Sequence, residues 1–182
     1  MPTELDVLRD VCMRLESVGI AYMLTGSMAL NYYAQPRMTR DVDLVIDIGL
    51  DTREKFSEVF TADYYVPHES IIAAIQAPGM FNLVHMESVV KVDFVVRKDD
   101  SYRETEFSRR KRVSFGGFEC WIVSREDLIL SKLAWALDSR SDFQLRDVRS
   151  LLQGEADWDY LRKWAPYLHV ESLLSECKDE RH

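Results

Sequence analysis

Residues 20–47 constrain the fold more than any other part of the chain, because they combine a strand, a glycine turn, a helix and a second strand. An apolar run from Ile20 to Leu24 ends in Thr25-Gly26-Ser27, and a short helical pattern follows over residues 28–34. Pro36 ends this helix, since proline cannot continue the backbone hydrogen bonding. Residues 41–46 then form an apolar run that begins with two carboxylates, which predicts a buried strand.

The two ends of this stretch offer complementary chemistry. A Gly26-Ser27 turn at the start of a helix presents free backbone N–H groups and the positive end of the helix dipole, which suits a phosphate. Asp41 and Asp43 lie two residues apart on a strand, so their side chains share one face, with roughly 7 Å between the Cα atoms. These carboxylates repel each other unless a cation lies between them, and Mg²⁺ binds carboxylates together with substrate phosphates. The stretch therefore predicts a metal–nucleotide site.

The spacing of these residues resembles a known signature. Gly26-Ser27, thirteen further residues and Asp41-Val42-Asp43-Leu44 resemble the signature of the DNA polymerase beta-like nucleotidyltransferase superfamily. The run from Arg37 to Asp43 is also similar to the small bacterial nucleotidyltransferases of the abortive-infection toxin type. Each part has a simpler interpretation when taken alone: a turn with a helix cap for Gly26-Ser27, and a solvated strand start for the two aspartates.

A third acid lies inside the strand predicted for residues 89–96. One face carries Lys91, Asp93 and Val95, and the other carries the alternating apolar residues Val90, Val92, Phe94 and Val96. An acid in such a strand is costly to bury unless it is paired or binds a cation. The resemblance implies a third catalytic carboxylate on a neighbouring strand, and Asp93 is the natural match. The alternative is a surface ion pair between Asp93 and Lys91.

Lys132 is the basic residue that we expect at the nucleotide. From Ser124 the pattern is helical, and Lys132 lies between apolar positions of this helix. A lysine there can extend along an apolar face to reach water, whereas the resemblance implies that it reaches the nucleotide's phosphates. Residues 146–152 resemble the family's later Arg-Asp-containing helix. In it, Asp147 forms a structural salt bridge or orients Lys132 or a substrate group.

The composition is ordinary for a soluble globular protein, with 47% hydrophobic and 30% charged residues in 182. Cys12, Cys120 and Cys177 are far apart and form no Cys-x-x-Cys or Cys/His cluster, so neither a disulfide framework nor a zinc site is predicted. No apolar run approaches ~20 residues, and the N-terminus is not a signal peptide. We therefore expect no membrane contact and a cytoplasmic location.

The charge distribution is uneven. A net charge of −8 argues against non-specific coating of nucleic acid. Residues 97–112 nevertheless carry a net charge of +3, and they end in the basic run Arg109, Arg110, Lys111 and Arg112. Such runs are mostly solvated surfaces. The alternative is a binding surface for an acidic acceptor such as RNA, or for a protein partner.

The elements do not alternate regularly enough for a doubly wound parallel sheet. We expect an α+β fold, with a mixed, mostly antiparallel sheet and helices packed on one face, as the resemblance implies. The predicted division is a nucleotidyltransferase core over residues 1–123 and a C-terminal helical subdomain over residues 124–182. Residues 101–109 are ambiguous, and residues 176–182 are expected to fray. The other expected elements are helices near 3–18, 51–60, 68–77, 124–137, 142–152 and 157–167, and strands at 80–86, 89–96, 111–115 and 118–123.

The resemblance implies a metal-dependent nucleotidyltransferase that moves a nucleoside monophosphate from an NTP to an acceptor hydroxyl and releases pyrophosphate. Asp41, Asp43 and Asp93 would be the catalytic residues and would hold two Mg²⁺ or Mn²⁺ ions. Gly26, Ser27 and Lys132 would bind the nucleotide. The acceptor stays open between an RNA such as tRNA, a protein and a small molecule, and a cognate toxin or antitoxin is a candidate partner. The alternative is a non-catalytic module of the same fold that binds a nucleotide or a partner.

Overall fold

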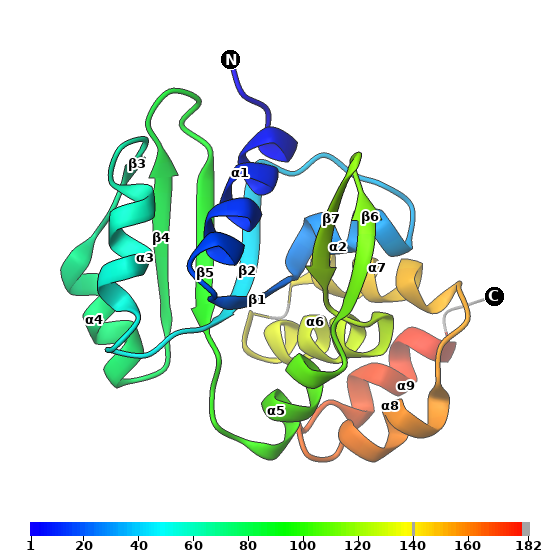
Figure 1. Cartoon of the computed structure of the whole chain (residues 1–182). Coiled ribbons are helices and arrows are strands. Elements are labelled where there is room, and N and C mark those ends of the chain that lie inside the picture. The colour runs from blue at the N-terminus through cyan, green and yellow to red at the C-terminus, as the bar shows by residue number, and fades with distance from the viewer. Residues whose placement is uncertain (140, 180–182) are drawn as a thin grey trace.

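The computed structural model describes residues 1–139 and 141–179. Within these residues it has seven strands and nine helices (Figure 1). The strands are β1 (Ala21–Leu24), β2 (Asp41–Asp47), β3 (Tyr64–Tyr65), β4 (Met80–His85), β5 (Lys91–Val96), β6 (Lys111–Phe115) and β7 (Phe118–Ile122). The helices are α1 (Glu4–Ser17), α2 (Gly26–Tyr33), α3 (Arg53–Phe60), α4 (His68–Gln76), α5 (Ser101–Ser108), α6 (Arg125–Ser139), α7 (Asp142–Leu152), α8 (Trp158–Trp164) and α9 (Glu171–Asp179).

All seven strands form one sheet in the order β3-β4-β5-β2-β1-β7-β6. Most neighbours are antiparallel, but β2 runs parallel to β5, and β1 runs parallel to β7. This confirms the expected mixed, mostly antiparallel sheet. The parallel β2–β5 pair lies near the middle of the sheet and carries the predicted acids.

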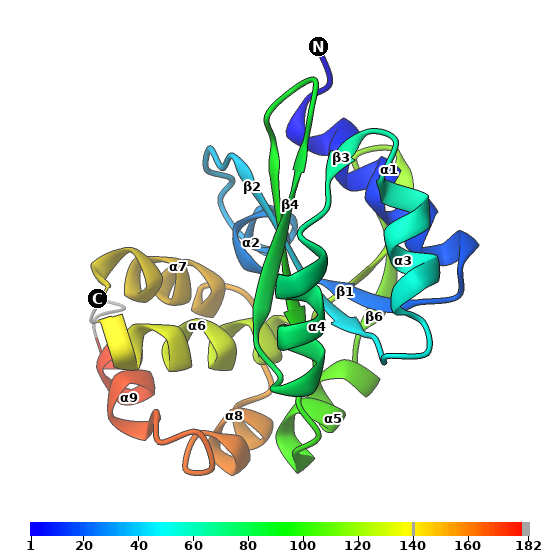
Figure 2. The same cartoon turned by 90° about the vertical axis from the view of Figure 1, so that its left-hand side faces the viewer.

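The central strands bury one face much more completely than the other. Val42, Leu44, Val92 and Phe94 are fully buried, and the ring of Phe94 packs edge-on against Phe56 of α3. Figure 2 shows α1 and α3 on one side of the sheet, with α2, α6 and α7 on the other. The alternate side chains of β2 and β5 therefore face the side on which α2 begins.

The chain after β7 continues as helices. Ser124 caps α6, because its hydroxyl accepts a hydrogen bond from the backbone N–H of Asp127 at 3.2 Å. Helix α6 contacts α2, α7, α8 and α9. A separate subdomain over residues 124–182 stays a prediction, and residues 180–182 of that range lie outside the described residues.

Most of the expected elements form, and the first helix begins with a capping box between Thr3 and Asp6. Helix α5 forms in the ambiguous segment, and the short strand β3 was not predicted. The expectation of a frayed end is wrong for residues 176–179, because α9 continues to Asp179; residues 180–182 lie outside the described part. No helix in the described residues has the length and apolar character needed to cross a membrane.

Candidate functional site

The register of two parallel strands places Asp43 and Asp93 side by side. In the β2–β5 pair, Asp43 is opposite Asp93, and Asp41 is opposite Lys91. Neighbouring strands lie roughly 4.8 Å apart, and residues in the same register project to the same face. The third acid is therefore on the same side of the sheet as the first two.

The turn before α2 closes directly over Asp43. Gly26 has a φ of +62°, and a Cβ built on it would lie 2.1 Å from a carboxylate oxygen of Asp43. A backbone hydrogen bond from Thr25 N to Asp43 O, 2.9 Å long, ties the turn to β2. Glycine is needed here both for the left-handed backbone and for the space. The predicted phosphate turn and the predicted acid thus belong to one site.

The electrostatics of Asp43 reflect this crowding. Burial raises the pKa of its carboxyl, and the negative charges of Asp93 and Asp41 raise it further. A hydrogen bond from the backbone of Ser27 and the charge of Lys132 act in the opposite direction. A nearby cation stabilises the ionised form of such a carboxyl. A metal ion or a metal-bound nucleotide would therefore offset the unfavourable burial and repulsion at Asp43.

The three acids fit a hard divalent cation in their chemistry, since Mg²⁺ prefers carboxylate oxygens. In this structure, however, the three carboxylates are not arranged to coordinate one ion together. Asp93 pairs with Lys91 at 2.8 Å. The ion pair that the sequence offered as the alternative for Asp93 is therefore present. Among the described residues, no three His, Cys, Asp or Glu side chains lie close enough together to hold a metal ion as they stand.

Lys132 projects from α6 toward the same region but is bound to α7. Its Nζ donates to Asp147 Oδ2 at 2.7 Å and to Gln144 Oε1 at 3.1 Å, and the residue is only 5% exposed. Burial lowers the pKa of Lys132, while Asp147 and Asp43 raise it. Asp147 orients Lys132, so the two alternatives for Asp147, a structural salt bridge and an orienting residue, describe the same contact.

Arg37 is a residue of the site to which the sequence assigned no role. Its Nη2 donates to Ser27 Oγ at 2.6 Å and to Asp147 Oδ2 at 2.9 Å, and its Nε donates to Asp147 Oδ1 at 3.1 Å. Arg37 therefore connects the turn to the Asp147–Lys132 pair. Its place in the run before Asp41 was the available signal, but Asp147 is 110 residues away, and no local pattern indicates that contact.

The basic run at 109–112 contacts the chain's own acids and aromatic rings. Arg109 pairs with Glu126 and Asp127, and its guanidinium lies 3.8 Å from the centre of the Tyr160 ring. Arg110 lies 4.2 Å from the Phe107 ring, and Arg112 pairs with Glu16 at 3.2 Å. Lys111 and Arg112 are exposed. Three of the four residues thus have structural partners within the chain.

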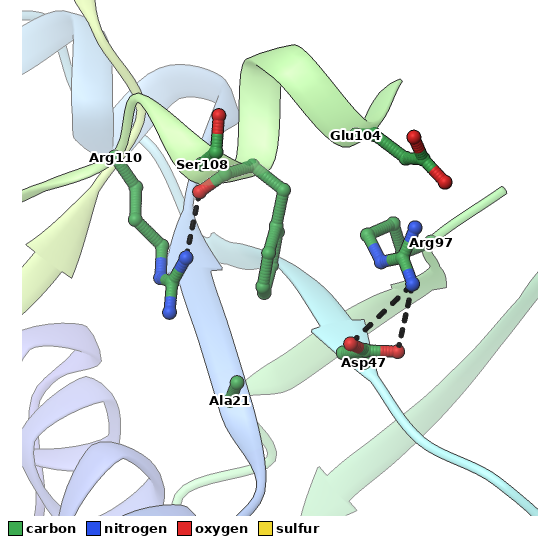
Figure 3. A pocket seen from close by; sticks show the side chains of 7 residues that line it. Ala21, Asp47, Arg97, Glu104, Ser108 and Arg110 are labelled. Atoms are coloured by element: carbon green, nitrogen blue, oxygen red, sulfur yellow. Dashed lines mark hydrogen bonds and ion pairs between the residues drawn. The ribbon is translucent and has the colours of Figure 1, made fainter. Parts of the chain in front are cut away.

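A separate hollow of about 340 Å³ opens near the other end of β2 (Figure 3). Arg97 and Arg110 line it together with Asp47, which is the last residue of β2. Arg97 is paired with Asp47 at 3.3 Å. None of the predicted catalytic or nucleotide-binding residues lines the hollow, and Arg110 is the member of the basic run that does.

The fold is that of a nucleotidyltransferase, as likenesses to solved structures show. The lincosamide antibiotic adenylyltransferase LnuA, solved with lincomycin bound, has a TM-score of 0.56 and 14% identity over 82% of this chain and 96% of that one. ANT(2″)-Ia in complex with adenylyl-2″-tobramycin has a TM-score of 0.56 and 11% identity over 98% and 99%. An antigenic nucleotidyltransferase-like protein from Paracoccidioides brasiliensis has a TM-score of 0.55 and 18% identity over 96% and 91%.

The family follows from the sequence itself. The family described as nucleotidyl transferase AbiEii toxin, type IV TA system, matches residues 11–162. The chain belongs to this family, which confirms the resemblance to toxin-type nucleotidyltransferases. No curated protein matches the chain significantly.

Proposed function

We propose that the chain transfers a nucleoside monophosphate from an NTP to an acceptor hydroxyl, with release of pyrophosphate. The observation that carries this proposal is the matched register of Asp43 and Asp93 beside the Gly26–Ser27 turn. The turn at the start of α2 can bind phosphate, and the adjacent acids can bind the Mg²⁺ that accompanies a triphosphate. Membership of the toxin family supports the same reaction class.

The predicted site residues divide the steps of the proposed reaction among them. The acceptor oxygen attacks the α-phosphorus, the bond from that phosphorus to the bridging oxygen breaks, and pyrophosphate leaves. Asp93 accepts the proton of the acceptor hydroxyl after its ion pair with Lys91 has opened. The backbone of Gly26 and Ser27 binds the leaving phosphates, and Lys132 offsets the charge that develops on them.

Asp41, Asp43 and Asp93 are the residues that would hold Mg²⁺ or Mn²⁺, and two ions are expected. Bound ions would neutralise phosphate charge and stabilise the attacking and leaving oxygens. The chain's own contribution is to fix two of these acids on adjacent strands and one at the strand start. This geometry positions the reactants, which is the main requirement of phosphoryl-type transfer.

The acceptor remains the open part of the proposal. LnuA and ANT(2″)-Ia are named for antibiotic substrates or complexes, so small hydroxylated molecules are candidates. The description of the toxin family makes a cognate antitoxin a candidate partner. An RNA or protein could contact the basic run, of which Lys111 and Arg112 are the exposed members.

A labelling experiment tests the proposal. The protein is incubated with Mg²⁺ and each α-labelled NTP in turn, together with total RNA, a protein lysate, or lincomycin and tobramycin. We expect label in one fraction, with pyrophosphate released in equal amount and abolished by EDTA. Nucleotide binding without pyrophosphate release, for every acceptor offered, would instead favour a non-catalytic module.

A further inference from the structure

Arg37 is held beside the turn by contacts from three directions. Its guanidinium bonds to Ser27 on α2 and to Asp147 on α7, as described above. Its backbone is fixed separately: Asn31 Nδ2 donates to Arg37 O, and Arg37 N donates to Asn31 Oδ1, both at 2.9 Å. Asn31 lies one helical turn after Ser27 on α2. A long, flexible side chain on a loop is thus placed at one point before any ligand arrives.

The charge balance at this point favours an anion. Asp147 is the carboxylate that pairs with both Lys132 and Arg37, so two cations share one negative charge. Within this group of three residues one positive charge is in excess, and it lies next to the first turn of α2, where the helix dipole is also positive. Asp43, whose carboxylate lies beside Gly26, is the nearby negative charge that a bound cation would offset. Arg37 remains 39% exposed at its side chain, whereas Lys132 is almost fully buried. Of these two cations, Arg37 is the one that an incoming ligand can reach.

The contact with Ser27 identifies the part of the ligand involved. Ser27 Oγ is 2.6 Å from Arg37 Nη2, so a phosphate bound at the turn would lie within reach of the guanidinium. Guanidinium groups bind phosphate oxygens through two parallel hydrogen bonds, which is a geometry that a lysine cannot offer. Among the described residues, Arg37 Nη1 has no hydrogen bond or ion pair, and it is available for such a contact.

We propose that Arg37 binds the terminal phosphates of the NTP at the Gly26–Ser27 turn, and that Asp147 and Asn31 position it there. This inference rests on the proposed function, since it assigns a residue to the same site. It predicts that Arg37 distinguishes triphosphates and pyrophosphate from monophosphates. Asp147 and Asn31 act through Arg37 and are positioning residues.

The test measures equilibrium binding in Mg²⁺ for the intact protein and for Arg37→Gln. The probes are inorganic pyrophosphate, the four NTPs and the four corresponding NMPs, so that the unknown base does not limit the experiment. We expect Arg37→Gln to weaken pyrophosphate and the preferred NTP by about 10- to 100-fold, because a charge-assisted contact is lost. NMP affinity should change by less than about twofold, and Arg37→Lys should recover only part of the loss.

Arg9→Gln is the matched control, because Arg9 is exposed on α1 and lies outside the site; its affinities should equal those of the unaltered protein. Equal loss of NTP and NMP affinity in Arg37→Gln would show that Arg37 only ties the loop to the helices, and would overturn the inference. Unchanged pyrophosphate binding would overturn it as well, while leaving the proposed function intact. An unaltered protein that binds neither pyrophosphate nor any NTP would overturn both.

Discussion

The tightest packing in the site is between Gly26 and the carboxylate of Asp43. Gly26 combines a left-handed backbone with a Cα that is covered by the carboxylate of Asp43. Either feature alone would favour glycine, but the second one also fixes the position of a predicted catalytic acid. The turn and the acid therefore depend on each other, and a change in one should be detected in the other.

Gly26→Ala should lose both stability and activity. The backbone conformation costs an alanine roughly 1–2 kcal/mol, and the displaced Asp43 carboxylate adds an overpacking cost of about 1–3 kcal/mol. We expect a fall in transfer rate of at least about 100-fold, because a shift of an ångström in a reacting group has effects of that size. Thermal unfolding and the labelling assay measure the two effects.

Gly19→Ala provides the control for backbone strain. Gly19 has a φ of +71°, and a Cβ there would have no atom within 4 Å. It should therefore lose a similar amount from strain but nothing from crowding, and it should keep full activity. Equal destabilisation of the two variants, with activity retained in both, would show that the close approach to Asp43 is unimportant.

Part of the site could be predicted at this scale because its signals are local. The two-residue spacing of Asp41 and Asp43 and the glycine before a helix are visible in a short window of sequence. Asp93 required the alternation of one strand together with the family resemblance, which implies a third acid on a neighbouring strand, and the structure places it opposite Asp43. The Arg37–Asp147 contact could not be predicted, because it depends on how α7 packs across α2 rather than on a local pattern.

At the scale of elements, Asp127 is the residue that joins α6 to its neighbours. It is fully buried, and its carboxylate accepts hydrogen bonds from Ser124 at 2.5 Å, Tyr160 at 2.6 Å and Arg109 at 3.1 Å. These partners come from the start of α6, from α8 and from the segment after α5. One carboxylate therefore fixes the angle between three parts of the chain.

Asp127→Ala should strongly destabilise the protein. Removal of the carboxylate takes away the acceptor of the Ser124 and Tyr160 hydroxyls and leaves Arg109 with Glu126 alone. Two unsatisfied donors in a buried region cost about 3–5 kcal/mol together. For a chain of this size, that corresponds to a fall in melting temperature of about 10 °C or more. Asp159→Ala is the comparison, since Asp159 pairs with Arg162 but its side chain is 95% exposed; its melting temperature should stay within ~2 °C. Similar melting temperatures for the two variants would contradict the role of Asp127.

The elements that were missed lack a clear apolar stripe. Helix α5 is mostly polar, and its inner face includes Glu106, which is buried against Arg103 and Ser131. Such a polar core contact breaks the periodicity on which a helix prediction depends. Its N-cap was present in the sequence, because Asp100 accepts from the backbone N–H of Arg103 at 2.9 Å. Helix α9 was hidden by its charged end, although Leu174 and Cys177 are buried.

At the scale of the whole molecule, the two faces of the sheet differ: one packs against the hydrophobic core, and the other carries the predicted acids. One face is covered by α1 and α3 over an aromatic and aliphatic core, and the other carries the acids beside α2 (Figure 2). All three cysteines are buried, and none forms a disulfide among the described residues. The fold class was predictable because irregular alternation of elements excluded a doubly wound sheet and the family resemblance implied a mixed, mostly antiparallel one. The strand order was not, because pairing between distant strands leaves no mark in a single sequence.

The central claim is that Asp43 lies at the centre of the reaction site, and Asp43→Asn tests it most directly. The change keeps the size of the side chain and removes a charge that burial, Asp93 and Asp41 all disfavour, so the melting temperature should hold within a few degrees or rise. Asp47→Asn is the control on the same strand, because Asp47 is half exposed and pairs with Arg97 away from the site. We expect no label transfer and no pyrophosphate release from Asp43→Asn, and full activity from Asp47→Asn. Undiminished transfer by a folded Asp43→Asn protein would contradict the account.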